Sequence, residues 1–145
     1  MDYKRLKNTI YIRIDKGESV VQTILSVCQK EKVYGGYFQG IGACHTATIS
    51  TYIPEKEDFV DHKIAGMIEM ISLMGNVSAD DTNTVFQHSH AAFSYLKEDG
   101  QPAVIAGHLK DAQISYTGEI VLTPAEEKID RIFDSSIGID IWSLS

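Results

Sequence analysis

One segment of the sequence has the apolar spacing of a helix, and most of the remaining chain alternates like β-strands. In residues 19–32 apolar side chains recur every three or four positions, as on one face of a helix. A strand pattern precedes this segment, and a run of strand patterns joined by short turns follows it. This order predicts an α+β fold with a mostly antiparallel central sheet and one principal helix, the sheet being open or curled toward a barrel.

The boundaries of the predicted elements follow from turn residues and from changes in spacing. We expect strands over residues 9–15, 59–66, 67–79, 85–96, 103–109 and 113–123, and within 35–54 a short strand, a glycine-rich bend and a second strand that ends at Pro54. A helix is expected over 19–32 that ends at Gly35-Gly36, and the charged tail, residues 124–134, is a candidate helix. Gly40-Ile41-Gly42 is expected to form a bend or bulge, because His45 stands where a phosphate-binding loop needs its third glycine. A second bulge is expected at Gly75.

Length and charge limit the classes of function. A chain of 145 residues is expected to form one domain, residues 1–145, that buries roughly 70% of its unfolded surface. The formal net charge is −7 and the basic residues form no cluster, which disfavours binding to DNA or anionic lipid. The sequence has neither a signal-peptide pattern nor an apolar run of membrane-spanning length, so we expect a cytoplasmic protein without membrane association. Cys28 and Cys44 are expected to be buried free thiols.

The sequence QHSH, residues 87–90, is the first candidate for a chemical site. In an extended strand, His88 and His90 leave the same face of the sheet. His45 and His62 have no such partner, and they are interpreted as ordinary strand and hairpin histidines.

A third histidine follows on the next predicted strand. A hairpin centred between Asp99 and Gly100 leaves His108 one residue out of register with His90, and a bulge at Gly107 would remove that difference. Three neutral imidazoles would then converge, an arrangement that suits zinc with a fourth position open. Nickel, cobalt and manganese are alternatives, and so is a purely structural role of the histidines.

Two glutamates are candidates for a catalytic role beside such a metal. Glu69 lies on a strongly apolar strand, and Glu119 follows a glycine on the last predicted strand. Either carboxylate could act as a general base or orient an imidazole. The alternative is that each points to solvent from an alternating strand.

Several stretches together resemble the PPC domain, which is known from plant AT-hook proteins and from stand-alone bacterial and archaeal proteins. They are the helix followed by GGYFQGIGA, then MIEMISLMGNVS, QHSHAAFS and AGHLKDAQISYTGEIVL. The resemblance covers roughly residues 8–123, and the histidine pair with the GHL that follows is its most specific part.

The resemblance implies a homotrimer and, in some stand-alone members, a metal site on the histidines that match His88, His90 and His108. The family is commonly labelled DNA-binding through its plant members, but this chain contains no R-G-R-P core of an AT-hook. The fold also looks similar to that of acetolactate decarboxylase, which has a three-histidine zinc site. A likeness of fold licenses no reaction.

Three hypotheses follow. The first is a trimeric PPC-domain protein with a three-histidine transition-metal site and a small-molecule or regulatory role. The second is a DNA-associated, transcription-related or protein-interaction module. The third is a metal-dependent lyase or hydrolase acting on a small keto or carboxylic acid, and the sequence leaves open whether the chain is an enzyme.

Overall fold

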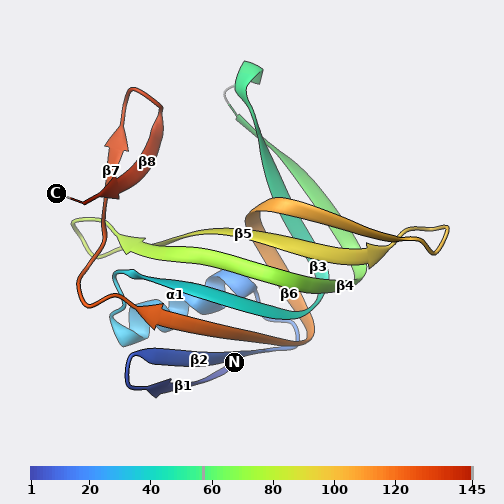
Figure 1. Cartoon of the computed structure of the whole chain (residues 1–145), viewed down its shortest axis with the longest axis horizontal. Helices are drawn as coiled ribbons and strands as arrows, with labels where there is room; N and C mark the ends of the chain where they lie inside the picture. The colour runs from blue at the N-terminus through green and yellow to red at the C-terminus, as the bar shows by residue number, and fades with distance from the viewer. Residues whose placement is uncertain (57, 145) are drawn as a thin grey trace.

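In the computed structural model, which describes residues 1–56 and 58–144, eight strands form one sheet and one α-helix packs against it (Figure 1). The elements are β1 (Asp2–Leu6), β2 (Thr9–Asp15), α1 (Val20–Glu31), β3 (Gly36–Ile53), a 3-10 helix η1 (Pro54–Lys56), β4 (Asp58–Ala79), β5 (Val85–Leu96), β6 (Pro102–Pro124), β7 (Asp130–Asp134) and β8 (Ile139–Ser143). The pairing is antiparallel apart from one parallel bridge between Ala79 and Asp130. The fold is therefore mostly strand with one α-helix, as predicted.

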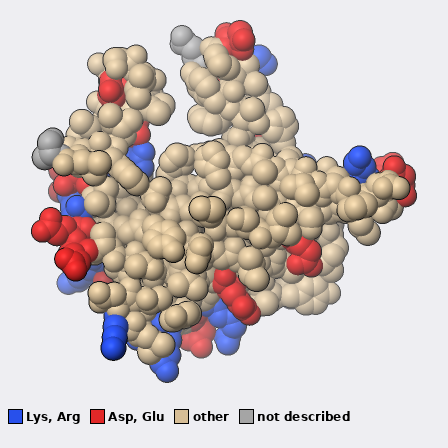
Figure 2. All heavy atoms as spheres, in the orientation of Figure 1, with Lys and Arg blue, Asp and Glu red and all other residues tan. Residues whose placement is uncertain are grey.

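The four long strands pair in a partial ring. β3 pairs with β4 and β6, and β5 pairs with the same two strands from the other side. β1 and β2 extend the sheet from β6, whereas the β7–β8 hairpin joins it through β4. The β7–β8 hairpin and the far end of the β3–β4 hairpin project from the body, and Figure 2 shows a hollow between them.

Several predicted boundaries were wrong because long strands continue through irregularities in pairing. β3, β4 and β6 each join segments that the sequence divides at glycines or polar residues. The irregularity expected at Gly40-Ile41-Gly42 is confirmed as a register shift between β3 and β4. Gly75 shows no shift, since its pairing with Ser89 continues the register on both sides.

The two ends of the chain also differ from the predictions. Residues 2–6, which were assigned no element, form β1. The tail predicted as a helix instead contributes β7, which pairs with β8 through a turn closed by hydrogen bonds from Gly138 N and Ser136 N to Asp134. A charged composition fits either element, and the pairing with β8 decides in favour of a strand.

The helix is fixed at both ends. Ser19 Oγ accepts a hydrogen bond from Gln22 N at 3.0 Å and donates to Asp111 Oδ1 at 2.8 Å, so the start of α1 is capped and tied to β6. The helix ends at Glu31, before Gly35-Gly36, because Lys32 adopts a left-handed conformation that satisfies the last carbonyl groups. None of the helices in the described ranges has the length and apolar character that a bilayer crossing needs.

The core lies between α1 and the inner face of the sheet. Its fully buried large side chains come from the helix and from every long strand: Phe38, Phe93, Ile10, Ile14, Ile24, Ile49, Ile68, Met70, Leu73, Leu109, Ile114 and Ile120. Each buried side chain of this size stabilises the fold by about 1.5–3 kcal/mol relative to exposure. Cys28 and Cys44 are buried free thiols in this core, as predicted, and burial raises the pKa of each to about 12.

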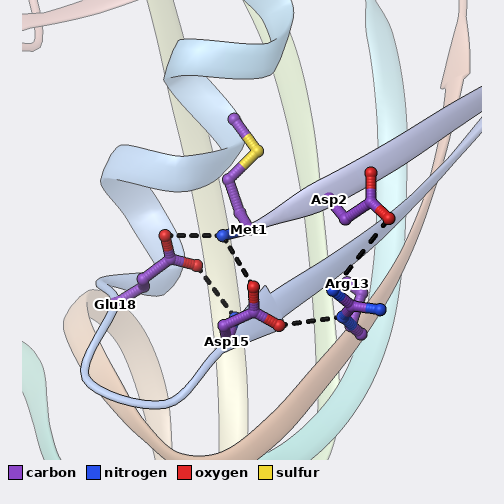
Figure 3. Close-up of polar contacts among 5 residues, drawn as sticks. All are labelled: Met1, Asp2, Arg13, Asp15 and Glu18. Atoms are coloured by element: carbon purple, nitrogen blue, oxygen red, sulfur yellow. Dashed lines mark hydrogen bonds and ion pairs between the residues drawn. The ribbon is translucent and has the colours of Figure 1, made fainter.

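The amino group of Met1 lies between two carboxylates next to the start of the helix (Figure 3). It is 2.7 Å from Glu18 Oε1 and 2.9 Å from Asp15 Oδ2, and Arg13 Nε donates to Asp15 Oδ1 at 2.8 Å. The Met1 ammonium lowers the pKa of Glu18, while Arg13 and then Met1 lower that of Asp15. These charges hold β1 and β2 against the loop before α1.

Gly75 lies on β4, beside the strand that carries QHSH, at a position where close packing leaves no room for a side chain. A Cβ at this position would clash with the ring of Phe38 and lie 2.6 Å from Ser89 Cβ and 2.8 Å from the His88 carbonyl oxygen. We expect Gly75→Ala to lower the free energy of unfolding by about 1–3 kcal/mol, because the core cannot accept the added methyl group without moving. Urea denaturation measures this change, with Thr51→Ala on the exposed part of β3 as a control expected to stay within about 0.5 kcal/mol of the parent. Equal stability of both variants would contradict the packing argument.

Candidate metal centre

The structure brings the three predicted histidines together. His88 and His90 leave the outer face of β5, and His108 on β6 stands directly opposite His90. One nitrogen from each ring lies within 4.8 Å of the other two, and the ring centroids are 5.1–5.5 Å apart. A single metal ion could accept one nitrogen from each ring.

The turn, and not a bulge at Gly107, sets the register of this pair. Lys97 N donates to Gln101 O, and Gly100 N donates to Lys97 O, both at 2.9 Å. The loop therefore holds five residues and is centred on Asp99. From the end of this loop to the His90–His108 pair the register contains no shift.

The histidines lie on the outside of the sheet. His88 and His90 are exposed and His108 is half-buried, whereas Ser89 between the first two is 2% exposed and faces the core. On the far side of His108, the ring of Phe59 lies 5.5 Å away, centroid to centroid. Solvent thus reaches His88 and His90, and the Phe59 ring packs beside His108.

The surroundings favour neutral imidazoles. Burial, and then the neighbouring His90 and Arg131, lower the pKa of His88, while burial and the other two histidines lower that of His108. Metal ions bind the neutral ring, so these effects favour coordination. A donor set of three nitrogens without a carboxylate fits zinc or another transition metal and does not fit magnesium or calcium.

Four neighbours of the histidines were missed from the sequence. Ser50 stands opposite His108, and Asp61 stands opposite Ser50 in the next strand. Asn76 on β4 stands opposite His88. The fourth, Arg131, comes from the distant β7, and no spacing rule links any of these residues to the histidines before the strand register is known.

The negative charge of Asp61 is already balanced by a neighbouring cation. Its Oδ1 accepts a 2.7 Å hydrogen bond from Ser50 Oγ, and its Oδ2 pairs with the Lys110 ammonium. Lys110 and then Ser50 lower the pKa of this carboxyl group. It is therefore ionised but engaged, and its charge is balanced locally.

The two predicted catalytic glutamates lie together, away from the histidines. Glu69 and Glu119 both line a pocket of about 420 Å³ to which no histidine contributes. Glu69 stands opposite Ser94, four residues along β5 from His90, which corresponds to roughly 13 Å. A general base acts within about 3 Å of the proton or through one water molecule, so within one chain Glu69 does not reach the histidine centre.

A larger groove of about 980 Å³ runs over the outer face of the same sheet. Glu119 lines it together with its cross-strand neighbours Arg13 and Ile41. Met74 lines its other end and stands opposite His90. The groove therefore approaches the histidine centre but does not include it.

Comparison with known proteins identifies the family. A sequence model described as the Plants and Prokaryotes Conserved (PCC) domain matches residues 1–126. This is the plant- and prokaryote-conserved family expected from the sequence, abbreviated PPC or PCC. None of the curated protein sequences matches the chain.

Solved structures agree with this match. A "putative DNA-binding protein" from Bacteroides thetaiotaomicron is 25% identical, with a TM-score of 0.88 over 98% of this chain and 96% of that one. A PPC protein from Pyrococcus horikoshii is 29% identical, with a TM-score of 0.79 over 98% and 93%. A metal-containing protein from Archaeoglobus fulgidus is also 29% identical, with a TM-score of 0.79 over 98% and 96%.

A more distant likeness concerns the fold alone. Alpha-acetolactate decarboxylase from Bacillus subtilis is 11% identical, with a TM-score of 0.56 over 88% of this chain and 57% of that one. The likeness of fold expected from the sequence is confirmed, and it carries no statement about activity.

The lowered pKa values of His88 and His108 predict a pH dependence of the metal-free protein. Both imidazoles should titrate below the ordinary value of about 6.5, as measured by NMR of the ring nitrogens. Since the unfolded chain then binds more protons than the folded one, these two groups should lower stability as the pH falls below about 6.5. Midpoints at or above 6.5 for both rings would contradict the assigned environments.

Proposed function

The chain belongs to the Plants and Prokaryotes Conserved domain family, and we propose that it is a member that binds a transition metal through His88, His90 and His108. The observation that carries this proposal is the convergence of one nitrogen from each ring to within 4.8 Å. The printed description of the Archaeoglobus fulgidus protein as metal-containing supports it. Zinc is the metal that we propose, with nickel, cobalt and manganese as alternatives, in a cytoplasmic protein.

Three protein nitrogens leave room for a further ligand, which distinguishes this donor set from a closed structural site. Such a metal would supply a Lewis acid that holds or polarises an oxygen of a small molecule. The chain itself supplies an exposed approach to the histidines and the Phe59 ring beside His108. We therefore propose small-molecule binding at the metal as the role of the site.

We further propose that the protein assembles as a homotrimer. Apolar side chains of the large groove are half exposed or more in the single chain, with Tyr11 at 50%, Ile41 at 57% and Met74 at 61%. Contiguous apolar surface of this kind is typical of contacts between proteins. Met74 stands opposite His90, so burial of this groove by another copy would extend to the edge of the metal centre.

A metal-dependent lyase or hydrolase activity would need a proton acceptor near the metal. Asp61 is engaged by Ser50 and Lys110, and Glu69 and Glu119 line a separate pocket. A catalytic role for either glutamate thus requires that a second copy bring its carboxylate to the histidines of the first. We keep both glutamates as candidates only within the assembled protein.

Metal analysis tests the proposed function directly. Tag-free protein from the oligomer peak of a gel-filtration column should contain about one transition-metal ion per chain, and light scattering of that peak should give three chains. His88→Ala or His108→Ala should lose most of the metal, because two nitrogens do not complete the site. His45→Ala and His62→Ala are matched controls that should keep it, since both residues are exposed and outside the cluster. Wild-type protein that stays metal-free after incubation with zinc would overturn the proposal.

DNA association is the second candidate, and the printed name of the Bacteroides thetaiotaomicron protein is the observation that favours it. The net charge of −7 opposes it, and the face in Figure 2 shows Lys and Arg scattered among Asp and Glu. We expect no shift of duplex DNA in a mobility assay at about 0.15 M salt, with or without added zinc. A shift that weakens as salt rises would favour the DNA-associated module.

A further inference from the structure

Arg131 differs from the other two arginines of the chain in having no carboxylate partner among the described residues. Arg5 pairs with Glu31 at 3.1 Å, and Arg13 pairs with Asp15 at 2.8 Å. No carboxylate within residues 1–56 and 58–144 lies within 4.0 Å of the Arg131 guanidinium. Its Nη1 donates to Ser78 Oγ at 3.3 Å and its Nη2 to the Asp140 carbonyl oxygen at 2.7 Å. These neutral contacts orient the guanidinium, and no carboxylate of the described residues balances its charge.

The same contacts place Arg131 on the histidine face of the sheet. Ser78 lies two residues along β4 from Asn76, and Asn76 stands opposite His88. Residues two apart on a strand share a face and lie about 7 Å from each other. The positive charge of Arg131 also contributes to the lowered pKa of His88, as a nearby cation does.

A cation in this position is unfavourable beside an occupied metal centre unless an anion lies between them. Three neutral imidazoles leave the charge of a divalent ion uncompensated, and Arg131 adds a second positive charge on the same face. On the opposite side of the centre, Asp61 is balanced by Lys110. An anionic ligand near His88 would balance the positive charges of the metal ion and of Arg131.

We propose that a small oxyanion, a carboxylate or a phosphate, binds between the three-histidine metal centre and the Arg131 guanidinium. One oxygen would ligate the metal and another would accept hydrogen bonds from Arg131, whose planar fork matches either group. This proposal rests on the proposed function, because the metal supplies one of the two attachments. It adds a residue that lies beyond the family match over residues 1–126.

The position of the β7–β8 hairpin agrees with such a ligand. The hairpin carries Arg131 on one side of the hollow in Figure 2, and the β3–β4 hairpin, which carries Phe59, stands on the other. Phe59 packs beside His108, so the apolar side of the centre faces away from Arg131. A small organic acid could thus place its charged end toward Arg131 and the rest of the molecule toward Phe59.

Cobalt-substituted protein provides a test that needs no known activity. The visible absorption of bound cobalt changes when a further ligand coordinates, so it can be titrated with acetate, with inorganic phosphate and with neutral imidazole. We expect Arg131→Met to bind cobalt as the wild type does but to weaken acetate and phosphate binding about 10–100-fold. Imidazole affinity should not change, because it has no charge for Arg131 to bind. Arg5→Met, at an arginine on the opposite end of the sheet, should bind all three ligands as the wild type does.

Arg131→Lys distinguishes the loss of the planar guanidinium from a general loosening of the β7–β8 hairpin. It keeps the positive charge, so it should weaken the binding of the two anions by less than Arg131→Met does. The affinity for imidazole should again be unchanged. If neither variant weakens the binding of the anions more than the binding of imidazole, the proposed anion site is overturned while the proposed metal centre stands. If the wild type takes up no cobalt, both proposals are overturned. The anion that binds more tightly to the wild type identifies the carboxylate or the phosphate as the ligand class.

Discussion

The register between β5 and β6 is the constraint on which the candidate site and much of the core depend. It is set by the five-residue turn centred on Asp99 and runs without a shift to the His90–His108 pair. Because side chains alternate between the two faces, a slip of one residue would turn His108 inward and bring the buried Leu109 to the surface. The cost of exposing that apolar face therefore also keeps the third histidine beside the other two. The three histidines therefore need no additional contacts to hold their arrangement, since the packing of the core already fixes it.

This dependence explains what could be predicted from the sequence. The helix and most strands follow from local periodicity, and the shared face of His88 and His90 follows from spacing alone. The pairing of His108 with His90 was predicted correctly but for the wrong reason. Hydrogen bonds inside the turn, and not a bulge, determine the length of the loop. The continuity of β3, β4 and β6 was missed, since bulges interrupt the alternation that periodicity detects while the strand itself continues. Arg131 could not be predicted from the sequence for another reason. Only the pairing of β7 with β8 and the contact with Ser78 bring this residue to the histidines.

Net charge and local charge lead to different conclusions for this chain. The formal charge of −7 disfavours a nucleic-acid surface, which needs many cations in a row. Recognition of a small anion needs only one oriented cation and one metal ion, and such a site can exist on an acidic protein. Arg5 and Arg13 each pair with a neighbouring carboxylate, as do Lys110 and Lys128. Arg131 is the one arginine without such a partner among the described residues, and its positive charge lies on the face that carries the three histidines.

The separation between the histidines and the two glutamates bears on whether the site is catalytic. Metal-assisted hydrolysis or decarboxylation needs a proton acceptor or donor within reach of the ligand, in addition to a Lewis acid. In the single chain, Asp61 lies two strands across from His108, and its two oxygens are engaged by Ser50 and Lys110. Among the described residues, the histidine centre thus has the groups that the proposed oxyanion would need, but Asp61, Glu69 and Glu119 do not supply it with a free general base. The proposed binding role needs only one chain, whereas an enzymatic role would need a group from another copy. The groove that ends at Met74 is the surface through which we propose that such a copy approaches.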